Sequence, residues 1–222
     1  MNAGDAPRMT APADGIAGAA RDAAQRTAAR KRLRQDMIAR REALPPTDAA
    51  QRSAAVCAHL TARFSADFFA FFPDGRAKTI GFCWPVQNEP DLRPAIRTWL
   101  AQGGHACLPV VVAPGEPLAF RPWTPATPLA PDRYGIPTPS EGDLVLPDVL
   151  LIPVNAVDGA GFRLGYGGGF FDRTLTRLAA VGHPVVTLGV GFDFQRVDTI
   201  HPEPHDAPLM GLVTESGFVE FD

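Results

Sequence analysis

The sequence predicts a single α/β domain with a mostly parallel sheet. Two continuous apolar runs, residues 149–154 (VLLIPV) and 185–190 (VVTLGV), have the pattern of parallel strands that are covered on both faces. A helical pattern from about Phe170 to Leu178 lies between them, and strand–helix–strand alternation is typical of α/β folds. A chain of 222 residues is also long enough to bury one full core.

The N-terminal part of the chain changes character near residue 29. Residues 1–28 are rich in Ala, Gly and Asp and have no large apolar periodicity, so we predict a disordered extension ahead of a domain that spans residues 29–222. Within the domain, a first helix is predicted from an apolar stripe at about 100° per residue, made of Leu33, Met37 and Leu44. A basic stripe lies directly beside it and consists of Arg30, Arg34 and Arg41.

A second helix is predicted after Pro45 and Pro46, which end the first. Thr47 or Asp48 is expected to cap this second helix, which runs to about residue 64. A third helix is expected to open at Asp91. The apolar residues that we expect these two helices to turn inward are Cys57, Leu60, Phe64, Leu92, Ile96 and Leu100.

Two more strands are predicted ahead of the parallel pair. Residues 79–84 (TIGFCW) predict a buried strand, and residues 106–112 (ACLPVVV) predict another. Pro109 moves the latter toward an edge or a bulge, because proline cannot donate a ladder hydrogen bond. Residues 113–147 are Pro-rich and are expected to wrap the surface.

Composition and charge bear on the partners and the location that the sequence predicts. The net charge of -3 gives no general reason to expect a nucleic-acid or membrane partner, although residues 30–44 carry six Lys/Arg against two Asp/Glu. No stretch approaches the ~20 apolar residues of a membrane span. The three cysteines (Cys57, Cys83 and Cys107) are widely spaced among apolar neighbours, which predicts reduced, partly buried thiols and a cytoplasmic location.

The most informative segment is the Gly-rich stretch at residues 163–173 (RLGYGGGFFDR), which precedes a helical pattern. Glycine admits positive φ and lets backbone N–H groups approach a ligand closely. A helix start adds unpaired N–H donors and the positive end of a dipole, so the segment predicts a phosphate cradle. It lacks the GxxxxGK[ST] spacing of a P-loop and the glycine spacing of a Rossmann fingerprint.

Around this loop the sequence resembles the 5-formyltetrahydrofolate cyclo-ligases. The resemblance rests on a gapless line whose positions are Pro153, Asn155, Asp158, Gly161, Arg163, Leu164, Gly165, Gly167, Gly169, Phe171, Asp172 and Arg173. Residues 30–34 (RKRLR) are similar to the family's ATP-contacting helix, and residues 84–89 (WPVQNE) to its substrate segment. Residues 134–137 (YGIP) and 201–206 (HPEPHD) match two further segments in the same order. The likeness extends from about residue 29 to residue 215.

The resemblance implies a fold, a reaction and a site. The fold is a three-layer α/β sandwich of the NagB/RpiA/CoA-transferase-like kind. The reaction is the ATP- and magnesium-dependent conversion of 5-formyltetrahydrofolate to 5,10-methenyltetrahydrofolate. Arg163 and Asp172 are the implied catalytic residues, and Asp172 with Asp206 the implied magnesium ligands. The implied ATP-binding residues are Arg30, Lys31, Arg34, Arg163, Leu164, Gly165, Tyr166, Gly167, Gly168, Gly169, Phe170 and Phe171. The implied folate-binding residues are Trp84, Glu89, Tyr134, Tyr166, Gly167, Gly168, Gly169 and Phe170.

Several positions depart from the family's pattern and leave alternatives open. Arg30 and Gly168 stand where members often have Lys, Phe171 lacks a usual hydroxyl, and Met210 takes a position that is often acidic or Pro. These departures keep open a non-catalytic folate- or nucleotide-binding regulatory paralogue on the same fold. A sugar-phosphate isomerase is a further alternative, whereas a nucleic-acid-binding module is disfavoured because the basic run is one helix on an acidic protein. We expect a monomer that acts on small molecules.

Overall fold

The computed structural model describes residues 13–64 and 78–221, and its centre is a seven-stranded sheet. The strand order is β11-β10-β9-β6-β1-β2-β3. The five inner strands run parallel, and β3 and β11 are antiparallel at the two edges. The strands are β1 (Thr79–Gly81), β2 (His105–Val110), β3 (Ala119–Pro122), β6 (Val149–Pro153), β9 (Val186–Val190), β10 (Gly211–Thr214) and β11 (Gly217–Glu220).

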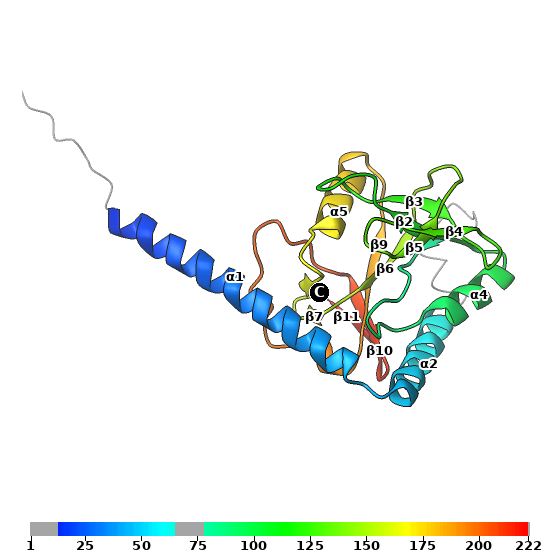
Figure 1. The fold of residues 1–222 in the computed structure, drawn as a ribbon, viewed down its shortest axis with the longest axis horizontal. Helices are drawn as coiled ribbons and strands as arrows, with labels where there is room; N and C mark the ends of the chain where they lie inside the picture. The colour runs from blue at the N-terminus through cyan, green and yellow to red at the C-terminus, as the bar shows by residue number, and fades with distance from the viewer. Residues whose placement is uncertain (1–12, 65–77, 222) are drawn as a thin grey trace, which may run out of the picture.

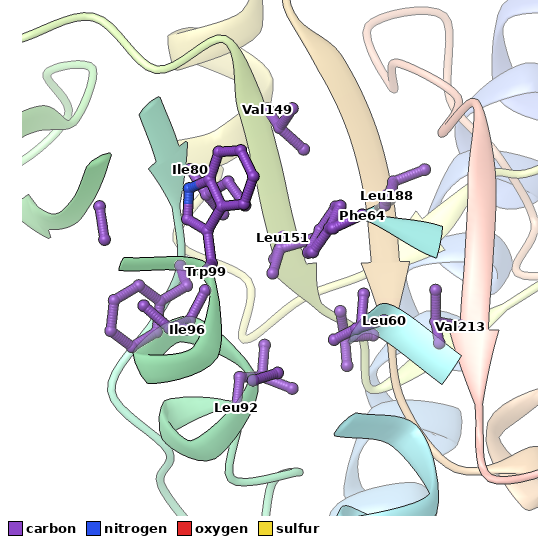
Figure 2. Close-up of a cluster of buried hydrophobic side chains, with 14 of the residues drawn as sticks. Leu60, Phe64, Ile80, Leu92, Ile96, Trp99, Val149, Leu151, Leu188 and Val213 are labelled. Atoms are coloured by element: carbon purple, nitrogen blue, oxygen red, sulfur yellow. The ribbon is translucent and has the colours of Figure 1, made fainter. Parts of the chain in front are cut away.

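Side chains of the central strand β6 point alternately to two helical layers, because successive residues of a strand face opposite sides. Val149 and Leu151 belong to the core cluster under helices α2 (Pro46–Arg63) and α4 (Arg93–Ala101), shown in Figure 2. Leu150 and Ile152 belong to the cluster under helix α5 (Phe170–Ala180). Both faces of β6 are therefore buried, which is why its sequence is a continuous apolar run. Figure 1 shows α5 on one side of the sheet and α2 with α4 on the other.

Helices α2 and α4 bury the apolar residues that their periodicity predicts. Cys57, Leu60 and Phe64 of the α2 region are buried, as are Leu92 and Ile96, while Leu100 is partly buried. The caps differ from the prediction: α2 begins at Pro46 without a side-chain cap, so neither Thr47 nor Asp48 caps it. Proline suits the first helical position because its fixed φ matches the helix and its missing N–H would have no partner within the helix.

Helix α1 spans Ala13–Glu42 and packs only its C-terminal half on the domain. Met37 is buried and Leu33 half-buried against the small hairpin of β7 (Ala156–Val157) and β8 (Arg163–Leu164). The helix then projects beyond the domain (Figure 1), and residues 21–28 are exposed. The structure continues the helix through residues 13–28, for which the sequence predicts a disordered extension; an Ala-rich segment has high helix propensity even without an apolar face. Residues 1–12 of the predicted extension lie outside the described residues.

The segment at residues 113–147 does more than wrap the surface. It supplies the edge strand β3 and a hairpin of β4 (Leu129–Pro131) and β5 (Pro137–Pro139). As a result β2 is not an edge strand, contrary to the prediction from Pro109. The pairing of β2 with β1 ends at Cys107, so Pro109 lies beyond the end of β1, where its missing N–H breaks no bond of that ladder.

The C-terminal hairpin of β10 and β11 was not predicted. Its strands contain four residues each, and β10 continues the parallel sheet beside β9 whereas β11 turns back along it. Such short strands leave little periodicity to detect.

The fold as a whole confirms the predicted α/β domain with a mostly parallel sheet. The finer likeness to the NagB/RpiA/CoA-transferase-like fold stays a prediction. The three cysteines are free, with Cys57 and Cys107 buried and Cys83 half-buried. In the described part of the chain no helix combines the length and the apolar character that a membrane crossing needs.

Candidate active site

The Gly-rich loop, residues 165–169, joins β8 to α5 beside the carboxyl end of β6. Gly167 and Gly169 have φ of 92° and 64°, in the left-handed region that favours glycine. Gly169 is also the N-cap of α5 and provides no side chain to occupy the first N–H groups of that helix. The loop and the helix start therefore leave backbone donors available to an anion, as the sequence predicts.

Two arginines from α1 approach this loop. Arg34 Nε donates to the Gly165 carbonyl over 2.6 Å, and a Cβ on Gly167 would lie 3.4 Å from Arg34 Cζ. Burial and the charge of Arg30 lower the pKa of Arg34, which places the two guanidinium groups in one electrostatic neighbourhood. Lys31 is exposed on the same helix. The basic stripe thus meets the loop through Arg34, with Arg30 close enough for its charge to act on Arg34.

Two carboxylates beside the loop are each paired with an arginine. Arg30 donates from Nη1 to Asp206 Oδ2 over 2.5 Å and from Nη2 to Oδ1 over 3.0 Å. Arg163 donates from Nη2 to Asp172 Oδ1 over 2.9 Å. Burial works against the charge of Arg30, yet its pKa is raised because the carboxylates of Asp206, Glu203 and Asp172 all act on it. The charges of the Arg30–Asp206 pair and of the Arg163–Asp172 pair therefore interact.

A cleft of about 520 Å³ runs along one face of α5, from Gly169 to Ala180, and Asp172 of the second pair lines it. Its lining includes Gly169 and Asp172 from the loop and the first turn of α5. The further lining residues are Gly115, Glu116, Pro117, Arg173, Thr176, Arg177, Ala180 and His205. The cleft is large enough for a nucleotide-sized ligand.

A second polar cluster lies where the loop approaches residues 84–89. The Tyr166 hydroxyl donates to Glu89 Oε1 over 2.6 Å, and the Val86 N–H donates to Oε2 over 3.0 Å. Arg41 Nη2 donates to the Tyr166 oxygen over 2.6 Å. Burial raises the pKa of Glu89, and the charge of Arg41 opposes this rise. Tyr166 leaves 45% of its surface exposed, so its ring faces solvent while its hydroxyl belongs to the cluster.

Comparisons with known proteins show which family has this sequence and fold. A family model described as the 5-formyltetrahydrofolate cyclo-ligase family matches residues 26–215. The chain belongs to this family.

Individual cyclo-ligases share about a third of the aligned residues with this chain. The 5-formyltetrahydrofolate cyclo-ligase of Mycolicibacterium smegmatis is 34% identical over 141 residues, covering 59% of this chain and 70% of the relative. The enzyme of the same name from Escherichia coli K12 is 34% identical over 147 residues, covering 63% and 79%.

Solved structures agree at the level of the fold. The NMR structure of Aquifex aeolicus 5,10-methenyltetrahydrofolate synthetase has a TM-score of 0.70 at 26% identity and covers 86% of this chain and 92% of its own. A 5,10-methenyltetrahydrofolate synthetase from Mycoplasma pneumoniae has a TM-score of 0.66 at 22% identity, covering 84% and 98%. The latter likeness supports the fold alone.

The remaining residues that the cyclo-ligase resemblance implies differ in how far their side chains are exposed near the loop. Leu164 is buried in the cluster that α1 covers, and Phe171 packs into the core beneath α5, so only their backbones face the loop. Phe170 lies edge-on to Tyr134, with ring centroids 6.1 Å apart. Tyr134 is 56% exposed, so residues 132–136 carry an aromatic ring to the start of α5.

Trp84 lies apart from these contacts. It packs partly against the core, and the Arg93 guanidinium carbon is 4.6 Å from its ring centroid. Its predicted role in folate binding stays a prediction, without a contact in the described residues that links it to Glu89.

Magnesium fits Asp172 better than Asp206 in this arrangement. Asp172 uses Oδ1 for Arg163, and no hydrogen bond from the described residues reaches its Oδ2 beside the cleft. Asp206 has both oxygens occupied, by Arg30 and by the Glu203 N–H. No three His, Cys, Asp or Glu side chains gather as a metal cluster within the described ranges. Magnesium needs few protein carboxylates when it also binds phosphate, so one open oxygen is compatible with it.

Arg41 and Asn155 were not predicted as site residues, although both were singled out in the sequence. Arg41 was grouped with Arg30 and Arg34, but its side chain is buried in the Glu89 cluster instead of facing the cleft. Asn155 accepts from Arg41 Nη1 over 3.0 Å. The signal available in the sequence was that Arg41 lies beside an apolar stripe, where a long side chain is easily covered.

Proposed function

We propose that this chain catalyses the ATP-dependent conversion of 5-formyltetrahydrofolate to 5,10-methenyltetrahydrofolate, with release of ADP and phosphate. The observation that carries the proposal is that one Gly-rich loop contributes to two unlike sites. Gly169 and Asp172 line the large cleft, whereas the Tyr166 hydroxyl reaches Glu89. A phosphoryl transfer between two substrates needs the attacking oxygen and the phosphorus held close together and aligned, and a shared loop can position both.

The residues around the Gly-rich loop and the neighbouring part of α1 are suited to ATP. Arg30, Arg34 and the loop's N–H groups offer positive charge and donors to a triphosphate. In this proposal Arg163 stabilises the negative charge of the transferred phosphoryl group, and Lys31 contributes from the exposed face of α1. Arg30 exchanges Asp206 for phosphate oxygens when the nucleotide binds.

Magnesium is the cofactor that this proposal includes. Asp172 would hold it through Oδ2, and Asp206 would join once Arg30 has turned to phosphate. When bound, it neutralises charge on the phosphoryl oxygens and orients them. The role of the protein is to keep Asp172 in position, which Arg163 does through Oδ1.

The Glu89 cluster is suited to the pterin of the folate. A carboxylate accepts two hydrogen bonds side by side, which matches an amino group next to a ring N–H. Tyr166 and Tyr134 offer ring surface, and Trp84 is retained in this proposed set. The loop glycines and Phe170 then border the formyl group.

The reaction proceeds in two steps. The N5-formyl oxygen attacks the γ-phosphorus of ATP, the bond to the ADP oxygen breaks, and an imidate phosphate forms. Folate N10 then attacks the formyl carbon and loses its proton, and phosphate departs with the formyl oxygen as the ring closes. An amide oxygen is a weak nucleophile, so alignment and charge stabilisation must supply the acceleration.

The test is a turnover assay with purified protein, 5-formyltetrahydrofolate, ATP and Mg²⁺, followed by the absorbance of methenyltetrahydrofolate. We expect product that depends on ATP and a decrease when Mg²⁺ is chelated. Binding of both ligands without product would favour the non-catalytic paralogue that Gly168, Phe171 and Met210 keep open. Absence of folate binding would overturn the proposal.

We also propose that the protein is a cytoplasmic monomer. Light scattering tests the oligomeric state, and cell fractionation tests the location.

A further inference from the structure

The side chain of Arg41, in the last turn of α1, is completely buried. A buried arginine is rare unless its charge is paired and its donors are used, because removing it from water is costly. The neighbouring Arg40 is exposed and lies over the Phe194 ring, with its guanidinium carbon 4.8 Å from the centroid. Two adjacent arginines of one helix thus have opposite environments, which gives a matched control.

Arg41 first contacts the turn that carries Glu89. Its Nε donates to the Gln87 carbonyl over 2.8 Å, and Asn88 Nδ2 donates back to the Arg41 carbonyl over 3.3 Å. Gln87 and Asn88 have φ of 48° and 58°, an uncommon conformation for two consecutive residues other than glycine. A turn of this kind persists only where its surroundings hold it. The end of α1 supplies that support.

Arg41 also fixes the direction of hydrogen bonds in the Glu89 cluster. A guanidinium only donates, so Tyr166 must accept from Nη2 and use its one proton toward Glu89. The same rule turns Asn155 Oδ1 toward Nη1. The order of donation is therefore Arg41 to Tyr166 to Glu89. Tyr166 belongs to the Gly-rich loop, so Arg41 joins the two segments between which the folate is proposed to bind.

We propose that Arg41 is a positioning residue for folate recognition: it holds the turn at residues 87–89 and the Tyr166 hydroxyl in place, and it sets a positive charge 3.9 Å from Glu89 Oε1. This inference rests on the proposed function, in which Glu89 binds the pterin. Arg41 itself touches neither substrate in this scheme and acts through Glu89 and Tyr166.

The groups around Glu89 determine the expected pH dependence. Arg41 Nη2 lies 3.9 Å from Oε1 and is the cation facing it, while Tyr166 and Cys83 are the other titratable groups close by. Burial raises the pKa of the Cys83 thiol and of the Tyr166 hydroxyl, so both stay neutral. Elsewhere Glu89 borders a small cavity of about 10 Å³ lined by apolar residues such as Leu92 and Leu151. Without Arg41 the largest influence that opposes burial is lost, although the hydrogen bonds from Tyr166 and the Val86 N–H remain, and the pKa of Glu89 would rise further.

The experiment compares Arg41→Met, Arg41→Lys and the control Arg40→Met with the wild type. Affinities for 5-formyltetrahydrofolate and for ATP are measured by calorimetry between about pH 6.5 and 9, with melting temperatures alongside. For Arg41→Met we expect folate affinity to fall by about tenfold to a hundredfold at the acid end and to recover as the pH rises. Arg41→Lys keeps the positive charge but loses the planar guanidinium, whose separate donors reach Gln87, Asn155 and Tyr166. Its folate affinity should therefore fall severalfold, with the pH profile of the wild type. The ATP affinity of both Arg41 variants should equal that of the wild type. Arg40→Met should bind both ligands as the wild type does.

A loss of folate affinity in Arg41→Met that is constant over pH, or that is accompanied by an equal loss of ATP affinity, would overturn the inference. If Arg41→Met does not fold, Arg41→Lys decides, and wild-type folate affinity in that variant would refute the positioning role. Failure of the wild type to bind 5-formyltetrahydrofolate would instead refute the proposed function.

Discussion

Arg30 and Asp206, 176 residues apart in the sequence, form a two-point ion pair that ties helix α1 to the loop before β10. Arg30 Nη1 also donates to the His201 carbonyl over 3.0 Å. His201 has a φ of 55°, so the pair closes on a turn that is itself in an uncommon conformation. The contact joins the helix that carries the basic stripe to the C-terminal part of the domain.

We predict that Asp206→Asn destabilises the protein at neutral pH and that the difference disappears in acid. Burial works to raise the pKa of Asp206, but the hydrogen bonds from Arg30 and the Glu203 N–H outweigh it and hold the pKa below the usual range. A depressed pKa contributes stability that is present above the ordinary value of about 4 and is lost as the pH falls through the lower, folded value. We expect a loss of about 1 kcal/mol at pH 7, because solvent partly screens the pair. Urea unfolding of both proteins at neutral and acid pH measures this; a constant difference would contradict it.

We predict that residues 1–28 are dispensable for turnover. Residues 21–28 are exposed on the projecting part of α1, and the contacts of that helix with the domain begin at Arg30 and Leu33. Deletion of residues 1–28 should leave turnover and melting temperature nearly unchanged. A longer deletion that removes Arg30 and Arg34 is the matched comparison and should abolish turnover. A clear loss in the shorter variant would show that the first part of α1 has a role.

The sequence predicted the sheet and the Gly-rich loop because both depend on local patterns. The apolar runs at residues 149–154 and 185–190 became the adjacent parallel strands β6 and β9, and the glycines do precede a helix. For residues 13–28, the lack of a large apolar periodicity predicted a disordered extension, whereas the structure continues α1 through them, as the helix propensity of alanine favours. The burial of Arg41 could not be predicted, since it depends on residues 46 and 125 positions away.

The same limit applies to the site. The family resemblance assigned Tyr166 and Glu89 to folate binding, but nothing in their spacing of 77 residues indicated a hydrogen bond of 2.6 Å. The pairing of each predicted metal-binding aspartate with an arginine was also not predicted: one pair depends on how the Gly-rich loop returns α5 to β8, and the other on how α1 meets the loop before β10. Contacts between distant segments are decided by packing, which one sequence does not display.

We predict that Gly167→Ala destabilises the loop more than Gly165→Ala. Gly167 has a positive φ, and an added Cβ would lie 3.4 Å from Arg34 Cζ. Gly165 has nothing within 4 Å of an added Cβ and is not in the left-handed region. The left-handed conformation costs a non-glycine residue about 1–2 kcal/mol, so the free energy of unfolding should fall by this amount in Gly167→Ala only. Equal losses in chemical denaturation would argue against a conformational requirement at residue 167.

We predict that Glu89→Gln weakens folate binding and spares ATP binding. The amide loses the charge and one of two acceptors, and a buried hydrogen bond to a charged group is worth about 1.5–3 kcal/mol, or one to two decades of affinity. Asp91→Asn is a suitable control, because that carboxylate lies two residues away and pairs with Arg93. Calorimetric titration with 5-formyltetrahydrofolate and with ATP separates the two effects. Unchanged folate affinity in Glu89→Gln would remove Glu89 from the site.

The last prediction is that Asp172 and Asp206 bind one magnesium ion together when ATP is present. The charges of Asp172 and Asp206 both act on Arg30, so the two carboxylates lie in one neighbourhood, and Asp172 Oδ2 is open beside the cleft. Asp172→Asn and Asp206→Asn should each reduce turnover sharply, with partial rescue at high Mg²⁺, because magnesium holds few carboxylates and bridges phosphate. Since the two would act as one unit, the double variant should be less than multiplicatively worse. Initial rates measured across a range of Mg²⁺ concentrations decide the matter. If the two effects multiply fully, or if Asp206→Asn turns over normally at limiting Mg²⁺, then Asp206 serves only to anchor Arg30 and Asp172 binds the metal alone.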